Sequence, residues 1–75
     1  MAIQKRWSYS QITKTAEEEI LRCMDLAGGA DTAVARMLYQ ARAEGVYNMW
    51  YELTCGWQND GDSRRMRALT EQANA

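Results

Sequence analysis

Histidine, proline and phenylalanine are absent from this chain of 75 residues, and β-branched strand formers are few. The valines and isoleucines are Val34, Val46, Ile3, Ile12 and Ile20. Without proline nothing interrupts a helix, and the abundant Ala, Arg, Glu, Met and Leu favour helices. The composition therefore predicts an all-α fold. Because a chain of this length can build only a small core, we expect a single domain.

The lack of histidine excludes a Cys/His zinc site and removes the usual base for a cysteine nucleophile. Cys23 and Cys55 form neither a CxxC pair nor a disulfide framework. Both cysteines fall in helical patterns, so we expect reduced, small core residues. The segment around Gly61 fails as a calcium loop, and Gly28-Gly29 fails as a phosphate-binding loop. We therefore expect a protein that is not an enzyme and needs no cofactor or metal.

The charge is low overall but unevenly placed. The net charge of −1 gives no strong field toward nucleic acid or an anionic membrane. Residues 17–19 are all Glu, whereas Arg64, Arg65 and Arg67 form a basic cluster. No apolar run approaches a membrane span, and no signal peptide is visible. We expect a cytoplasmic protein.

Cap signals predict a compact bundle of about four short helices over residues 11–75, preceded by an N-terminal arm over residues 1–10. Thr15 to Glu18 fits a capping box, with an earlier start at Ser10 as the alternative. Gly28-Gly29 should end this first helix, because glycine accepts the left-handed cap conformation. The residues expected to share its core face are Ile12, Ala16, Ile20, Cys23, Met24 and Ala27.

Asp31 or Thr32 should cap a second helix. Its expected core face holds Val34, Met37, Leu38 and Ala41. The apolar direction of that face differs by roughly 120° from that of residues 46–57, at 100° per residue. A break near Gly45 would resolve the conflict, so we favour one.

Residues 58–61 read as a turn. Asp62 or Ser63 should then cap a last helix, with Met66, Leu69 and Ala73 facing inward.

The segment 46–57 is apolar on more faces than one core needs. One stripe holds Val46, Met49, Trp50, Leu53 and Trp57, and a second holds Tyr47, Tyr51 and Cys55. We expect the first stripe to be core, with Trp50 buried. Tyrosine keeps a polar tip and is common at binding hot spots, so the second stripe is the candidate binding face.

The arginine cluster has two interpretations. Positive charge is mildly unfavourable at a helix start, so Arg64, Arg65 and Arg67 could contact phosphate or an acidic protein surface. Alternatively they form a solvated face, with Arg67 paired to Glu71. Trp7 joins the arginine cluster in one binding surface if the N-terminal arm folds near the last helix.

We therefore predict a protein-interaction module that binds stoichiometrically to a larger protein or complex. The candidate partner-binding residues are Tyr47, Tyr51, Arg64, Arg65, Arg67 and Trp7. A phage or mobile-element inhibitor of a host enzyme or defence system, anti-CRISPR-like in action, is one concrete form.

One alternative is a nucleic-acid-binding regulator, because Ala41, Gly45 and Val46 have helix-turn-helix spacing. However, the helix that follows lacks Lys and Arg, which makes nucleic acid unfavoured. The other alternative is a structural homodimer.

Overall fold

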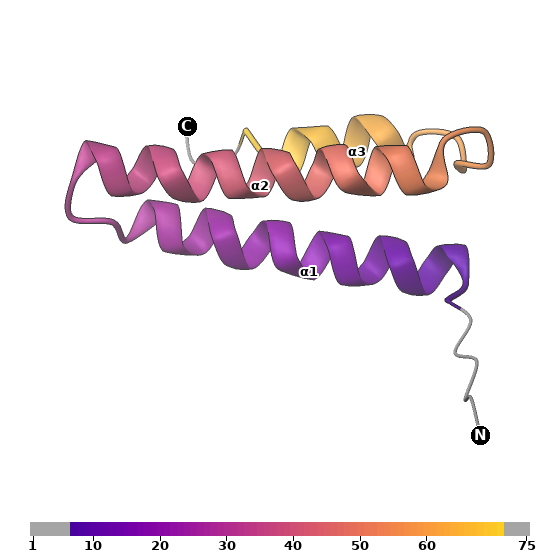
Figure 1. Ribbon diagram of the computed structural model, residues 1–75, viewed down its shortest axis with the longest axis horizontal. Coiled ribbons are helices and arrows are strands. Elements are labelled where there is room, and N and C mark those ends of the chain that lie inside the picture. The colour runs from indigo at the N-terminus through magenta and orange to yellow at the C-terminus, as the bar shows by residue number, and fades with distance from the viewer. Residues whose placement is uncertain (1–6, 72–75) are drawn as a thin grey trace, which may run out of the picture.

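The computed structural model describes residues 7–71 as three helices. These are α1 (Tyr9–Gly28), α2 (Ala33–Thr54) and α3 (Asp62–Leu69). α1 and α2 form an antiparallel hairpin, and α3 contacts both of them (Figure 1). The all-α prediction is confirmed, with no strand within residues 7–71, but the helices number three rather than about four. Residues 1–6 of the predicted arm and Ala73 lie outside the described part.

α1 begins earlier than the predicted capping box at Thr15. Ser8 is the N-cap, and its hydroxyl accepts a 3.1 Å hydrogen bond from the backbone N–H of Gln11. The Gln11 side chain in turn accepts from the Ser8 N–H at 2.9 Å. This reciprocal pair satisfies two helix-end donors, which places Thr15 inside the helix. The arm therefore stops short of residue 10, because Tyr9 and Ser10 are helical.

The predicted turn between the two long helices is confirmed. α1 ends at Gly28, and the N–H of Gly29 donates to the Asp25 carbonyl at 3.2 Å. Gly29 has φ −96°, so this end does not use the left-handed conformation that we expected. Thr32 caps α2, since its hydroxyl accepts from the Ala35 N–H at 3.0 Å.

α2 runs without interruption through Gly45, so the predicted break is wrong. The two apolar directions that suggested a break do not conflict, because the predicted core face of the first half of α2 is not the face that this half turns inward. Val34, Met37, Leu38 and Ala41 are all exposed, and the prediction that they form a core face is also wrong. The buried residues of α2 are Ala43, Trp50 and Thr54. The turn that a helix-turn-helix would need at Gly45 is therefore absent.

These residues are exposed because, at 100° per residue, they lie on the side of α2 opposite to the buried Ala43, Trp50 and Thr54. Eight helical residues span about 12 Å, against about 33 Å for the 22 residues of α2. α3 starts from the C-terminal end of α2, so it cannot reach back over the full length of the hairpin (Figure 1).

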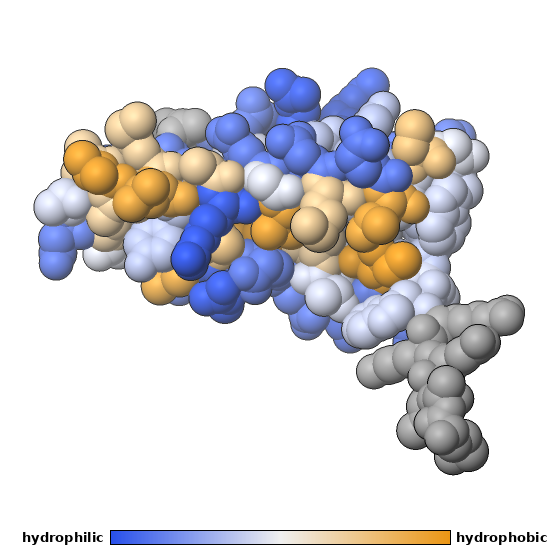
Figure 2. Space-filling view, viewed as in Figure 1, coloured by the Kyte–Doolittle hydropathy of each residue, from blue (hydrophilic) through white to orange (hydrophobic). Residues whose placement is uncertain are grey.

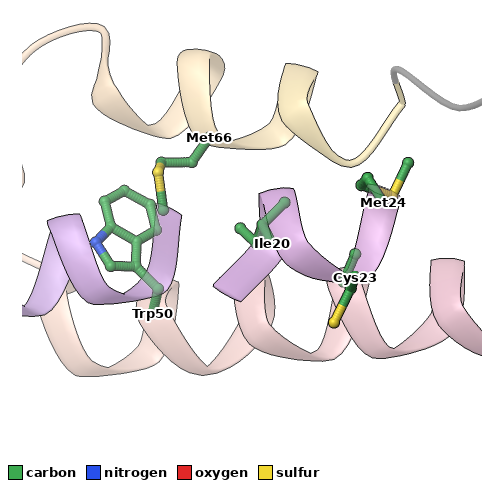
Figure 3. Close-up of a cluster of buried hydrophobic side chains, with 6 residues drawn as sticks. Ile20, Cys23, Met24, Trp50 and Met66 are labelled. Carbon is green, nitrogen blue, oxygen red and sulfur yellow. The ribbon is translucent and has the colours of Figure 1, made fainter. Parts of the chain in front are cut away.

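The core lies where the three helices meet. Ile20, Cys23 and Met24 of α1 belong to this buried cluster, with Cys23 directed toward α2, and Met66 reaches from α3 toward the Trp50 ring (Figure 3). The predicted face of α1 is confirmed, since Ile20, Cys23, Met24 and Ala27 are buried and Ile12 and Ala16 pack against them. Burial of Trp50 is likewise confirmed, with 1% of its surface exposed. Cys55 is exposed, so its assignment to the core is wrong.

The turn before α3 is confirmed, but its predicted cap is not. Gly61 is the N-cap, with φ 86°, and no side chain caps this helix end. That positive φ is the conformation in which glycine costs least. Asp62 and Ser63 instead hydrogen-bond to the tyrosines of the other two helices: Tyr9 donates to Asp62 at 2.7 Å, and the hydroxyls of Tyr47 and Ser63 lie 3.0 Å apart. As predicted, Met66 is buried, and Leu69 packs against the core.

Candidate protein-binding surface

An open depression of about 870 Å³ lies between the C-terminal half of α2 and the start of α3. We name it the tyrosine–arginine pocket. Its lining residues are Tyr47, Asn48, Tyr51, Glu52, Gly61, Ser63, Arg64 and Arg67. Four of the six residues that the sequence nominated for binding are therefore brought together: Tyr47, Tyr51, Arg64 and Arg67.

Packing and one hydrogen bond fix the geometry of this pocket. Burial of Met66 holds α3 against the hairpin, and the contact between the Tyr47 and Ser63 hydroxyls ties α3 to α2. The Tyr47 and Tyr51 rings lie one helical turn apart, with centroids separated by 6.1 Å. Tyr47 is half-buried, whereas 42% of Tyr51 is exposed. The expected accessibility of the two rings is therefore observed, and Tyr51 presents the larger free surface.

The two arginines of the pocket have no acidic partner among the residues that the structure describes. Within residues 7–71, the ion pairs are those of Arg22 with Glu19 and of Arg65 with Glu17 and Asp62. The pair between Arg67 and Glu71, which a solvated face would have used, does not form. Arg64 and Arg67 are both exposed, so their guanidinium groups are open to an outside ligand.

Arg65 points the other way and has a structural partner. Its guanidinium donates to Glu17 of α1 and lies 3.5 Å from Asp62. The hydrogen bond to Glu17 raises the pKa of Arg65 above its usual range. The cluster predicted from sequence is thus divided: one arginine joins α3 to α1, and two face the pocket.

Trp7 does not join the tyrosine–arginine pocket. It lines a second, more apolar depression of about 770 Å³ between α1 and α2, which we name the hairpin groove. The groove is lined by Trp7, Ile12, Thr15, Ala16, Glu19, Arg42, Gly45, Val46, Met49, Trp50 and Leu53, with no residue of α3. Figure 2 shows apolar surface over both long helices on this face.

The sequence did not reveal the hairpin groove as a surface. Met49 and Leu53 were assigned to the core, yet 66% and 56% of their surfaces are exposed. The pattern showed that this part of α2 is apolar on two sides but not which side α3 covers. Residue types alone do not distinguish the covered side from the exposed side, because both sides of this segment carry large apolar or aromatic side chains.

No protein-family profile, curated protein sequence or solved structure matches this chain. No described helix is both long and apolar enough to cross a membrane. In the part of the chain from residue 7 to 71, no three acidic or cysteine side chains are grouped to hold a metal ion. The two depressions collect aromatic, apolar and guanidinium groups, which bind other surfaces noncovalently.

Proposed function

We propose that this chain is a small helical interaction module that binds a larger protein stoichiometrically, without catalysing a reaction. The observation that supports the proposal is the tyrosine–arginine pocket, where Tyr47 and Tyr51 of α2 meet Arg64 and Arg67 of α3. We further propose that the pocket receives an acidic segment of the partner.

The unpaired arginines favour an acidic ligand. Arg64 lies in the first turn of α3, where the helix dipole makes positive charge mildly unfavourable, so its position does not stabilise the helix. A planar guanidinium can donate two parallel hydrogen bonds to one carboxylate. Glu52 is the single acidic residue of the lining against two arginines, which leaves the pocket with a net positive charge.

The tyrosines add area and orientation. Tyrosine buries a large rigid ring at low entropic cost and keeps a hydroxyl for hydrogen bonding. Because the Tyr47 hydroxyl is already engaged with Ser63, its ring is preorganised, and Tyr51 is the group free to adapt. Preorganised contact groups raise affinity because less freedom is lost on binding.

The experiment is a pull-down from bacterial lysate with mass spectrometry, followed by titration of the captured protein. The site variant is Tyr51→Ser with Arg67→Ala. The matched control is Tyr39→Ser with Arg36→Ala, which removes the same groups from α2 outside the pocket. The site variant should bind at least about thirtyfold more weakly, because hot-spot truncations cost about 2 kcal/mol or more. Equal affinity of the site and control variants would overturn the proposal.

A nucleic acid in place of a protein in the pull-down would also overturn it. That outcome is recognised by its salt dependence, because each phosphate contact contributes about one unit to the slope of log affinity against log salt. Two free arginines would give a slope of about 2 with nucleic acid, whereas capture of a protein without nucleic acid supports the proposal.

A further inference from the structure

α2 carries an apolar stripe along its whole length on a side that no described element covers. Val34, Leu38, Met49 and Leu53 are each more than half exposed and recur near helical spacing. Arg42 and Gly45 fall between them on the same side, at 100° per residue. The stripe borders the hairpin groove, which Arg42, Gly45, Met49 and Leu53 help to line. Monomers seldom leave an exposed apolar stripe of this length without a binding role.

Packing within residues 7–71 gives no reason for a glycine at position 45. Gly45 lies in mid-helix, where glycine is about 1 kcal/mol less favourable than alanine. A Cβ added there would meet nothing within 4 Å. The fold therefore does not require a glycine at this position. A second helix crossing at Gly45 would require one, because small residues allow helix backbones to approach closely.

The spacing of the stripe is symmetric about the middle of α2. Val34 and Leu53 are equidistant from the midpoint of the helix, between residues 43 and 44. The same holds for Leu38 and Met49, and for Arg42 and Gly45. If two copies of α2 lie antiparallel across a two-fold axis, each apolar residue meets an apolar residue of the other copy. A two-fold interface needs this self-complementarity, since the same patch serves both sides.

We propose that the α2 stripe and the adjoining hairpin groove form a two-fold interface with a second copy of this chain, in which the two α2 helices pack antiparallel and cross near Gly45. The stripe extends about 29 Å. With α1 beside it the face is about 20 Å wide, since each helix is about 10 Å across, so it offers on the order of 600 Å² per copy, at the lower end for specific complexes. We therefore expect a dimer with a dissociation constant in the micromolar range.

The charges on this face are compatible with such pairing. Arg42 lies near the proposed axis, where two copies of it would approach each other. Glu19 lines the same groove, and its carboxylate, which is paired with Arg22, also interacts electrostatically with Arg42. The positive charge of each Arg42 is therefore partly offset by α1. The interface is separate from the tyrosine–arginine pocket, with which it shares no residue.

Sedimentation equilibrium on the full chain, from a few to several hundred micromolar, tests the proposal. The wild type should dimerise, and Leu38→Glu should weaken the dimer at least tenfold, because it would bury two carboxylates. Leu21→Glu on α1 is the matched control, being an exposed leucine outside the groove lining. It should sediment like the wild type, as should Arg67→Ala. A wild type that stays monomeric throughout would overturn the proposal.

Gly45→Leu separates interface from fold. Leucine is the better helix former, and the single chain leaves space at this position, so the melting temperature of a dilute sample should not fall. The dimer should be lost, because the added side chain holds the two helices apart. Undiminished dimerisation of this variant would contradict a crossing at Gly45.

Cysteine crosslinking tests the antiparallel register. Leu38→Cys and Met49→Cys are made separately on a Cys55→Ser background, since Cys55 is exposed and Cys23 is buried. On oxidation, a mixture of the two variants should give a dimer crosslinked between position 38 of one copy and position 49 of the other. Neither variant alone should crosslink much. Efficient crosslinking of Leu38→Cys with itself would show parallel helices and overturn the arrangement.

Discussion

The indole Nε1 of Trp50 donates a 2.9 Å hydrogen bond to the hydroxyl of Thr13, joining the two long helices inside the core. Both residues are buried, and Thr13 lies one turn after the start of α1. Tryptophan at a core position needs a partner for its N–H, and a threonine on the facing helix provides it. Within the described chain, no buried side-chain polar atom lacks a partner.

Thr13→Val should destabilise the protein although it preserves the shape of the side chain. It removes the acceptor and leaves the buried Trp50 N–H without a hydrogen bond, at a cost of about 1–3 kcal/mol. Urea denaturation measures the loss, with Thr13→Ser as the control that keeps the hydroxyl. A Thr13→Val midpoint equal to that of the wild type would show that the hydrogen bond contributes nothing.

Trp50→Ala should largely unfold the chain. Truncation of a buried tryptophan typically costs about 3–5 kcal/mol, and a domain this small has about 5 kcal/mol in total. Far-UV circular dichroism should show loss of helix at 25 °C. Trp57→Ala is the matched control, because half of the Trp57 surface is exposed. A cooperative melt of Trp50→Ala near the wild-type temperature would be inconsistent with this core.

The sequence predicts well where local chemistry decides the structure. Thr32 marks a helix start because capping acts within a few residues, and the Gly28-Gly29 pair marks a helix end because glycine is a poor helix former. The buried face of α1 could be predicted because its apolar residues form a single stripe. Trp50 could be placed inside because it is large and lies at the centre of the densest apolar segment.

The errors arise where long-range packing decides. Ser8 and Thr15 are both acceptable N-caps, and the helix that starts earlier gains a further contact, as Tyr9 then reaches Asp62. Leu38 belongs to an apolar periodic pattern that predicts core, but it is exposed because α1 and α3 pack against the side of α2 that carries Ala43, Trp50 and Thr54. Arg64 and Arg65 are neighbours in sequence, but one helical step turns them toward different surfaces. Only the fold shows that Glu17 meets Arg65.

Tyr9→Phe should loosen α3 from the hairpin. The Tyr9 hydroxyl donates to Asp62 and accepts from the Asn59 N–H at 3.1 Å, so it fixes both the turn and the start of α3. Loss of a hydrogen bond to a charged group costs about 1.5–3 kcal/mol. Hydrogen exchange should accelerate most in residues 58–69. Tyr39→Phe is the control, and equal exchange in both variants would argue against this contact as the anchor of α3.

Arg64→Ala with Arg67→Ala should act on the kinetics of partner binding, if the tyrosine–arginine pocket is the binding site. Neither guanidinium has an ion pair to lose, so stability should stay near wild type. Charges at an interface rim mainly steer association, so the association rate should fall and become less sensitive to salt. Stopped-flow mixing at two salt concentrations measures this. Arg22→Ala, on the outer side of α1, should leave the association rate unchanged.

The two cysteines should differ sharply in their reaction with iodoacetamide. Cys55 is exposed and should be alkylated within minutes at pH 8, as free thiols are. Burial raises the pKa of the Cys23 thiol above its ordinary value of 9.0, with a further contribution from the nearby Glu19 carboxylate. Iodoacetamide therefore cannot reach the Cys23 thiol, and this thiol is protonated rather than ionised at pH 8. Cys23 should react only when the chain unfolds. Mass spectrometry of timed samples distinguishes the two sites.

The raised pKa of Cys23 makes the free energy of unfolding depend on pH in a defined range. Well below pH 9 the Cys23 thiol keeps its proton in both the folded and the unfolded chain, so it adds no pH dependence there. As the pH rises through 9.0 the unfolded chain releases this proton while the folded chain retains it, so the free energy of unfolding should fall. Urea midpoints between pH 8 and pH 10 measure the fall. Cys23→Ala, although less stable throughout, should show a shallower decline over this range than Cys55→Ser, and equal slopes would place the titrating group elsewhere.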